Sequence, residues 1–155
     1  IISVDARGFI FGSAISLEAS KPMIVARKPG KLPGEILEKS YSLEYGKNSL
    51  SIQKKALNKY NSYAIVDDLL ATGGTVDCVS KILESYNKEV VGLLVVVELL
   101  KLGGRSRLKF PVKSSITFWK NIVNFFLDRC IRFGRKYLSI ITLIKWLIKI
   151  SWKDN

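Results

Sequence analysis

One segment in the middle of the chain, residues 64–76, constrains its fold and chemistry more than any other. An apolar run ends in two adjacent carboxylates, Asp67 and Asp68, and a loop of small residues with two glycines follows. The chain then enters a helical pattern. Open α/β sheets bind ligands in the crevice at the carboxyl ends of their parallel strands, so this order predicts a ligand site.

The two halves of this segment suit the two ends of a phosphorylated sugar. Asp67 and Asp68 can accept hydrogen bonds from vicinal hydroxyl groups, whereas they cannot bind a bare phosphate. The loop can, because glycines allow close backbone approach and the first N–H groups of the next helix point at an anion. The phosphate-binding residues predicted here are Ala71, Thr72, Gly73, Gly74 and Thr75.

A ribose 5-phosphate carries both kinds of group. The glycine spacing is not that of a Walker loop, because the Lys-Ser/Thr that would follow is missing. The plainer alternative is that the acidic pair caps a helix and that Gly73 and Gly74 form an ordinary turn.

Around this segment, apolar runs alternate with helical patterns, which predicts one α/β domain with a mainly parallel sheet. Residues 27–34 are rich in proline and glycine and are expected to form a loop. Residues 41–52 are expected to form a β-hairpin arm. The expected strands are residues 1–4, 23–26, 63–66 and 90–97, and the expected helices are residues 9–19 and the segment after Gly74.

Charge and cysteine content narrow the class of protein. The net charge of +12 favours an anionic partner but does not choose among nucleotide, polyphosphate, nucleic acid and anionic membrane. Cys78 and Cys130 give neither a disulfide framework nor metal-ligand spacing, and histidine is absent. A reducing cytoplasm fits this content best. The first residue is Ile1 within an apolar run, so we expect the natural N-terminus to be missing.

The character of the sequence changes at residue 118, so we divide the chain into residues 1–117 and a basic, aromatic and apolar tail, residues 118–155. The tail has eight basic residues against two acidic ones. Its apolar stretches are too short to span a membrane, which takes about 20 residues. An interfacial amphipathic helix with membrane contact is one reading. The favoured reading is that the tail does not belong to the ancestral fold of the domain.

Residues 64–76 closely resemble the phosphoribosyl-pyrophosphate motif of the type I phosphoribosyltransferases. Residues 4–12, 27–34 and 41–46 resemble the signature stretches of the adenine phosphoribosyltransferase family, in the family's order. Other type I relatives, such as orotate and xanthine enzymes and purine-sensing repressors, share the first motif but not this combination. The resemblance covers roughly residues 1–110 and implies the type I fold, an α/β fold with a mainly parallel sheet, flanking helices and a β-hairpin arm.

The resemblance also implies an activity in purine salvage. Ribose 5-phosphate would pass from phosphoribosyl pyrophosphate to adenine, giving AMP and pyrophosphate, with Mg²⁺ as the cofactor. Mg²⁺ would be held through substrate oxygens and water, since it keeps several waters in such sites, and direct ligation by Asp67 and Asp68 is left open. The intact family member is expected to be a homodimer that binds no nucleic acid.

Basic residues are candidates for neutralising the pyrophosphate leaving group. Arg7 follows the first strand and is assigned both a catalytic and a pyrophosphate-binding role. The other candidates are Arg27, Lys28 and Lys31, although each could simply be a solvated loop residue. The resemblance further implies a cis or strained non-proline peptide bond between Asp5 and Ala6.

Glu44 is the candidate general acid/base, on the basis of the Tyr-Ser-Leu-Glu-Tyr-Gly match. If the arm closes over the substrates, Glu44 would be desolvated and could handle the proton at the purine ring. Tyr45, beside it on the arm, is expected to contact the ligand, and Tyr41 to pack the arm. The plainer reading of Glu44 is an exposed side chain next to a turn.

No residue in this sequence can be assigned to recognition of the base. In the family the hood that binds the base comes largely from sequence ahead of the first strand, and the printed sequence lacks it. We therefore hypothesise that this chain binds phosphoribosyl pyrophosphate weakly or not at all, with little or no activity. The alternatives are a purine-responsive regulator that binds phosphoribosyl pyrophosphate without turnover, and another purine phosphoribosyltransferase.

Overall fold

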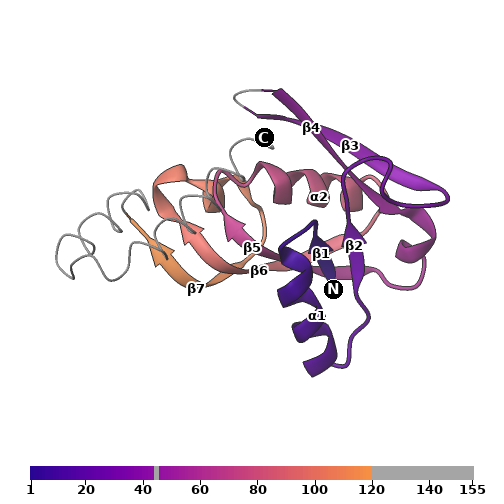
Figure 1. Ribbon diagram of the computed structural model, residues 1–155, viewed down its shortest axis with the longest axis horizontal. Helices are drawn as coiled ribbons and strands as arrows, with labels where there is room; N and C mark the ends of the chain where they lie inside the picture. The colour runs from indigo at the N-terminus through magenta and orange to yellow at the C-terminus, as the bar shows by residue number, and fades with distance from the viewer. Residues whose placement is uncertain (44–45, 120–155) are drawn as a thin grey trace, which may run out of the picture.

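The computed structural model describes residues 1–43 and 46–119, and its centre is a parallel sheet (Figure 1). Five strands lie in the order β2-β1-β5-β6-β7, and every neighbouring pair is parallel. They are β1 (Ile2–Val4), β2 (Ile24–Ala26), β5 (Ser62–Leu70), β6 (Glu89–Leu99) and β7 (Val112–Phe118). The predicted α/β class with a parallel sheet is confirmed.

Helices cover both faces of this sheet. As drawn in Figure 1, α1 (Gly8–Glu18) lies below the sheet and contacts β1 and β5, and α2 (Gly74–Glu84) lies above it. The predicted hairpin is also present, formed by β3 (Ile36–Leu43) and β4 (Gly46–Gln53). It packs on the outer side of α2, so α2 is enclosed between the hairpin and the sheet.

The core lies between α2, the sheet and the hairpin. α2 carries apolar residues at helical spacing, and Val76, Val79, Ile82 and Leu83 are almost completely buried. Such a helix is stabilised mainly by burying one face, at roughly 25 cal/mol per Å² of apolar surface removed from water. The packing of α2 also positions Gly73, the residue directly before it, near the carboxyl end of β5. The partners of α2 in this core include Leu50, Ile52, Leu57, Ile65, Leu70, Leu93 and Val95.

The structure differs from the expected elements most in three places. β5 runs to Leu70, four residues beyond the expected end at Val66, because its pairing with β6 continues to Leu70 opposite Glu98. The hairpin begins at Ile36 rather than at Tyr41. β7 is not among the strands expected from the sequence, since its alternation of polar and apolar residues is broken and only its pairing with β6 identifies it.

Three short 3₁₀ helices connect the strands, namely η1 (Lys54–Leu57), η2 (Leu100–Leu102) and η3 (Gly104–Arg107). None of the helices within the described residues is long and apolar enough to cross a membrane. The tail beyond residue 119 lies outside the described residues, as do its expected amphipathic helix and Cys130. The division at residue 117 stays a prediction.

Candidate functional site

The sheet changes winding direction between β1 and β5, and this is where the candidate site lies. From β1 the chain passes through α1 to β2 on one side, and from β5 it passes through α2 to β6 on the other. β1 pairs with β5 only as far as Ser3 opposite Val66. At such a switch point an open α/β sheet binds ligands in the crevice outside the carboxyl ends of its strands, so the candidate crevice lies beyond that pair.

The acidic pair lies in the last part of β5 rather than after it. Asp67 pairs with Val95 of β6, and strand pairing continues to Leu70. The strand end expected from the sequence, Val66, is therefore four residues early, because the strand is longer than its apolar run. The two carboxylates still lie beyond the last β1 pair, so they border the crevice.

Asp67 is buried, with 8% of its surface exposed. Burial, reinforced by the negative charge of Asp68, raises the pKa of Asp67 to about 8. Its Oδ1 accepts a hydrogen bond from the Asp68 backbone N–H at 2.8 Å. A Cβ on Gly8 would lie 3.1 Å from Asp67 Oδ1, so only a residue as small as glycine lets α1 begin this close to the carboxylate.

Asp68 binds the residue expected to contact pyrophosphate. Arg7 Nε lies 2.7 Å from Asp68 Oδ2, and the Arg7 side chain is 47% exposed. This ion pair joins the loop after β1 to β5 across the crevice. The peptide bond before Arg7, between Asp5 and Ala6, is cis, which confirms the expectation from the resemblance.

The other basic candidates lie in and beside the loop after β2. Arg27 Nε donates to Asp5 Oδ2 at 2.9 Å, so Arg27 borders the same crevice from β2. Lys28 and Lys31 are exposed, and among the described residues neither ammonium group has a hydrogen bond or an ion pair. Glu44 and Tyr45 lie outside the described residues. Their predicted roles, like the others in this site, stay predictions.

The glycine loop has the geometry of an anion site. Gly73 has φ +79° and Gly74 is the first residue of α2, so the free N–H groups of the first helical turn follow directly. Positive φ is a conformation that glycine adopts at little cost. Thr72 is exposed and Thr75 is partly buried, which leaves their hydroxyl groups at the same end of α2.

Two groups from elsewhere in the chain complete this loop. The Tyr41 hydroxyl of β3 lies 3.3 Å from Thr75 Oγ1, so the arm packs on the loop as expected. On the other side, η3 touches the loop so closely that a Cβ on Gly73 would lie 2.7 Å from the Gly104 carbonyl oxygen. The sequence does not predict this contact, because it joins two segments about 30 residues apart.

A buried ion pair fixes η3 in place. Glu98, at the end of β6, has only 3% of its side chain exposed and accepts two hydrogen bonds from Arg105, at 2.9 and 2.5 Å. Ser114 of β7 also donates to Glu98, at 2.8 Å. These bonds lower the pKa of Glu98, Arg105 first among them. Sequence reasoning assigned Glu98 and Arg105 no structural role.

Carboxylate oxygens are the ligand type that Mg²⁺ prefers, and the acidic pair offers them. Among residues 1–43 and 46–119 no group of three or more His, Cys, Asp or Glu side chains is placed to hold a metal by itself. A Mg²⁺ ion here would therefore need oxygen atoms from substrate or water.

Comparison with known proteins defines the class of this fold and site. The family model for the phosphoribosyl transferase domain matches residues 1–129. The chain therefore belongs to the phosphoribosyltransferase family.

Several relatives of this chain within that family are named adenine phosphoribosyltransferases. The adenine phosphoribosyltransferase of Prochlorococcus marinus (strain MIT 9515) is 85% identical over 118 residues, which make up 76% of this chain and 69% of that relative. Among solved structures, the adenine phosphoribosyltransferase of Thermoanaerobacter pseudethanolicus matches with a TM-score of 0.72 and 42% identity, over 76% of this chain and 69% of that one.

The adenine phosphoribosyltransferase of Saccharomyces cerevisiae, solved with an imino-altritol bisphosphate and adenine, matches with a TM-score of 0.70 and 36% identity. The match covers 74% of this chain and 65% of the yeast one. These names confirm the resemblance to the adenine branch of the family. They do not favour the regulator considered from the sequence.

Proposed function

We propose that this chain transfers ribose 5-phosphate from phosphoribosyl pyrophosphate to adenine, forming AMP and pyrophosphate. The observation that carries the proposal is that the acidic pair lies on β5 and the glycine loop follows directly after it, beyond the last residue pair of β1 and β5. The names of the relatives support adenine as the nucleobase. The yeast structure contains a bisphosphate and adenine, which are chemically similar to the two substrates proposed here.

In this proposal each end of the sugar has its own binding group. Asp67 and Asp68 accept hydrogen bonds from the ribose hydroxyls. The amide groups of residues 71–75, with the hydroxyls of Thr72 and Thr75, bind the 5′-phosphate. Holding both ends fixes C1 of the ribose relative to the incoming base, and such positioning alone lowers a reaction barrier substantially.

The reaction breaks the bond between ribose C1 and a pyrophosphate oxygen, and the bonding electrons leave with pyrophosphate. A nitrogen of adenine forms the new bond to C1. Arg7, Arg27, Lys28 and Lys31 stabilise the negative charge on the leaving group. Glu44 accepts the proton that the adenine ring loses.

Mg²⁺ fits the acidic pair together with substrate oxygens, and it supplies Lewis-acid polarisation of the pyrophosphate when bound. The ion pair between Arg7 and Asp68 must open, at least in part, for Arg7 to contact pyrophosphate. The free carboxylate of Asp68 can then accept a hydrogen bond from a ribose hydroxyl. Arg7 thus exchanges one anionic partner for another, at little electrostatic cost.

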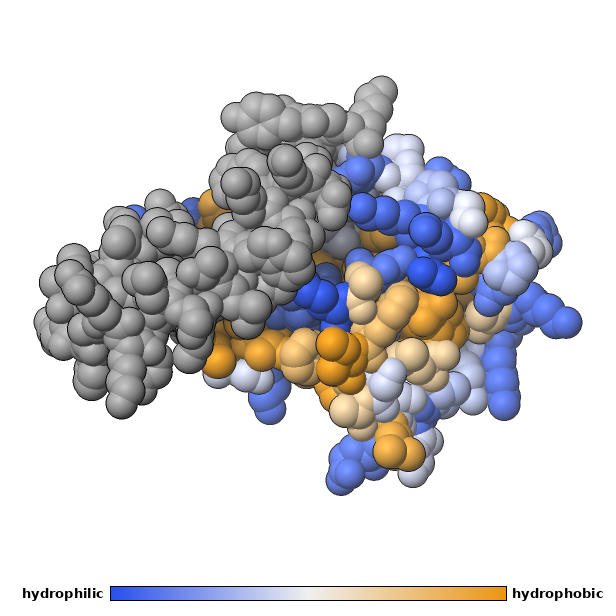
Figure 2. Space-filling view, in the orientation of Figure 1, coloured by the Kyte–Doolittle hydropathy of each residue, from blue (hydrophilic) through white to orange (hydrophobic). Residues whose placement is uncertain are grey.

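We also propose that the chain forms a homodimer through α1. Hydrophobic side chains gather over α1 on the face shown in Figure 2. Ile10 and Leu17, two turns apart on this helix, are 70% and 83% exposed. Large apolar side chains that are exposed together on one face usually mark an interaction surface, and a second copy of the chain would cover this face.

The test is AMP formation from adenine and phosphoribosyl pyrophosphate with Mg²⁺, compared with the variant carrying both Asp67→Asn and Asp68→Asn. The proposal expects the double variant to lose AMP formation while it keeps its fold. Equal turnover in the two proteins would remove the ribose role of the pair. Calorimetric titration of phosphoribosyl pyrophosphate adds the affinity, and a micromolar, Mg²⁺-dependent value would overturn the hypothesis of weak binding.

A further inference from the structure

The beginning of α2 is approached by an arginine that lies outside the glycine loop. Arg107, the last residue of η3, places its Nη1 atom 3.4 Å from the position that a Cβ on Gly74 would occupy. The ring of Tyr41 lies equally close to the same point. A guanidinium group therefore lies next to the first residue of the helix, at the end that binds the phosphate in the function proposed above.

Packing rather than chance determines the position of Arg107. η3 lies directly against the glycine loop, where a Cβ on Gly104 would lie 3.0 Å from the Gly73 nitrogen and still closer to the Ala71 carbonyl oxygen. The next residue, Leu108, packs on the hydrophobic core. The backbone on both sides of Arg107 is thus held against the phosphate site.

The two arginines of η3 differ in what they bind. Arg105 is fully engaged, with Glu98, the Val112 carbonyl oxygen at 2.7 Å and Ser114 as its acceptors. The Arg107 guanidinium is exposed, and no hydrogen bond or ion pair joins it to any residue within the described part of the chain. Arg105 therefore has a structural role, whereas the donors of Arg107 are free for a ligand.

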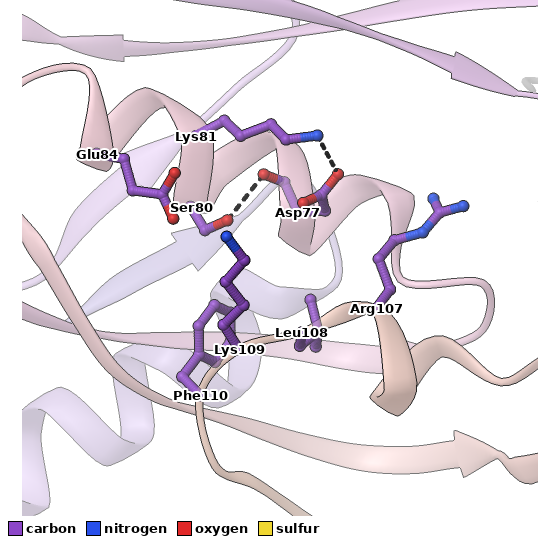
Figure 3. Close-up of a pocket in the computed structure, with 8 residues that line it drawn as sticks. All are labelled: Asp77, Ser80, Lys81, Glu84, Arg107, Leu108, Lys109 and Phe110. Atoms are coloured by element: carbon purple, nitrogen blue, oxygen red, sulfur yellow. Dashed lines mark hydrogen bonds and ion pairs between the residues drawn. The ribbon is translucent and has the colours of Figure 1, made fainter.

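Figure 3 shows the shallow pocket between α2 and the segment that follows η3. Arg107 stands at one end of this pocket and Glu84 at the other, and the Arg107 guanidinium points away from Lys109. The nearest acidic residue of α2, Asp77, is already paired with Lys81 at 2.7 Å. Neither lysine of the pocket is placed over the beginning of α2 as Arg107 is.

The proposed phosphate-binding segment carries no cationic side chain of its own. Residues 67–80 contain no lysine or arginine, and Asp67, Asp68 and Asp77 are all acidic. A phosphate monoester carries about −1.5 to −2 charges at pH 7, and the amide and hydroxyl donors of the loop only partly compensate that charge. An arginine can add two parallel N–H···O bonds to phosphate oxygens.

We propose that Arg107 binds the 5′-phosphate of AMP and of phosphoribosyl pyrophosphate, as a further substrate-binding residue supplied by η3. The proposal rests on the function proposed above and adds to it a charged ligand for the phosphate. In it the phosphate lies between the beginning of α2 and the guanidinium. The ligand class is a phosphate monoester on a pentose, because the hydroxyl end of the site is fixed by Asp67 and Asp68.

Calorimetric titration of the full chain with AMP and with adenosine tests this role. The proteins are the wild type, Arg107→Gln, Arg107→Lys and the matched control Lys109→Gln, which removes an exposed positive charge two residues further on. Arg107→Gln should weaken AMP binding about tenfold or more, as expected for hydrogen bonds to a charged group. Arg107→Lys should lose less, since it keeps the charge but not the fork.

Adenosine lacks the phosphate, so its affinity should be the same in the wild type and Arg107→Gln. Lys109→Gln should change AMP affinity by less than about twofold. Unchanged AMP affinity in Arg107→Gln would overturn the inference alone. An equal loss for adenosine, or an equal loss in Lys109→Gln, would also overturn it. A wild-type chain that bound no AMP, ribose 5-phosphate or phosphoribosyl pyrophosphate would instead contradict the proposed function, and the inference with it.

Discussion

Single residues in this protein are held in states that the free amino acid would not adopt. Asp67 is the main example, because burial next to Asp68 raises its pKa to about 8. The carboxyl group is then largely protonated in the folded chain at neutral pH, whereas it is ionised in the unfolded chain. A ligand that requires the ionised carboxylate must therefore offset the free-energy cost of deprotonating Asp67.

The pKa of Asp67 makes stability depend on pH. Between about pH 4 and pH 8 the folded chain binds more protons than the unfolded chain, so the free energy of unfolding falls as pH rises through this window. We expect Asp67→Asn to be more stable than the wild type at pH 8.5, by at least about 1 kcal/mol. The advantage should shrink toward pH 5, where the wild-type side chain is also neutral.

Urea unfolding at several pH values measures this difference. Asp77→Asn serves as the control, because Asp77 is ion-paired with Lys81 at the surface of α2. An advantage of Asp67→Asn that stays constant from pH 5 to pH 8.5 would show that Asp67 is ionised throughout.

At the scale of elements, η3 contacts the loop of residues 71–75, and the ion pair between Arg105 and the buried Glu98 attaches η3 to the end of β6. The Glu98 side chain is 3% exposed and that of Arg105 is 49% exposed. Removing the arginine would leave a buried carboxylate without its cation. Removing the partner of a buried carboxylate lowers the free energy of unfolding much more than removing a surface charge. The same substitution should therefore cost more stability at Arg105 than at Arg107.

We predict that Arg105→Met lowers the free energy of unfolding by roughly 2 kcal/mol, less than for a fully buried pair because Arg105 is half exposed. Arg107→Met should change it by less than about 0.5 kcal/mol. Chemical denaturation of both variants gives the comparison. Equal losses would mean that Glu98 finds another partner or is hydrated.

The contact between η3 and the loop can be tested by overpacking. Gly104→Ala would place a Cβ 3.0 Å from the Gly73 nitrogen, so one of the two segments must shift. We expect a loss of roughly 1–3 kcal/mol in stability and weaker AMP binding, since the loop amides move with the shift. Ser106→Ala removes a hydroxyl that donates to the Gly103 carbonyl oxygen at 2.7 Å and has no hydrogen bond to residues 71–75, so it should leave AMP affinity unchanged. Wild-type AMP affinity in Gly104→Ala would show that the loop does not depend on η3.

Sequence patterns identified the elements whose signals are local. The apolar runs of β1 and β6, the spacing of Val76, Val79 and Ile82 and the hairpin arm were all recognisable. β7 was not, because an edge strand with broken alternation depends on pairing with a strand far away in sequence. The full length of β5 was missed for a similar reason, since Asp67 and Asp68 are unusual strand residues that only pairing with β6 explains.

Some of the candidate site residues could be recognised from the sequence, but their contacts with other segments could not. The glycines and carboxylates of residues 64–76 form one continuous pattern, so they could be assigned from the sequence. The partners of Arg7 and Arg27, which are Asp68 and Asp5, could not, because they depend on how β1, β2 and β5 lie side by side. The closeness of η3 to the loop likewise required the fold.

At the scale of the whole molecule, three segments far apart in sequence meet at one edge of the sheet. The loop after β1 brings Arg7, the loop after β5 brings the glycines, and η3 after β6 brings Arg107. All three follow the carboxyl ends of parallel strands. Away from this edge the molecule has an apolar face on α1, which we assign to the contact with a second copy.

We predict that Leu17→Glu converts a dimer into monomers. The 83% exposed side chain contributes little to the fold of the isolated chain, so the variant should keep its secondary structure. A buried charge in an apolar interface is strongly unfavourable, so association should be lost. Sedimentation velocity gives the oligomeric state. Glu18→Gln, beside it on α1, is the control that should leave the dimer intact, and a monomeric wild type would refute the assignment.

The central claim is that Asp67 and Asp68 and the loop of residues 71–75 bind opposite ends of one pentose. A crystal structure of this chain with AMP tests it most directly. We expect the ribose hydroxyls within hydrogen-bond distance of the two carboxylates, and the 5′-phosphate on the amide groups at the beginning of α2. A ribose 5-phosphate unit bound at any other place in the molecule would contradict the claim.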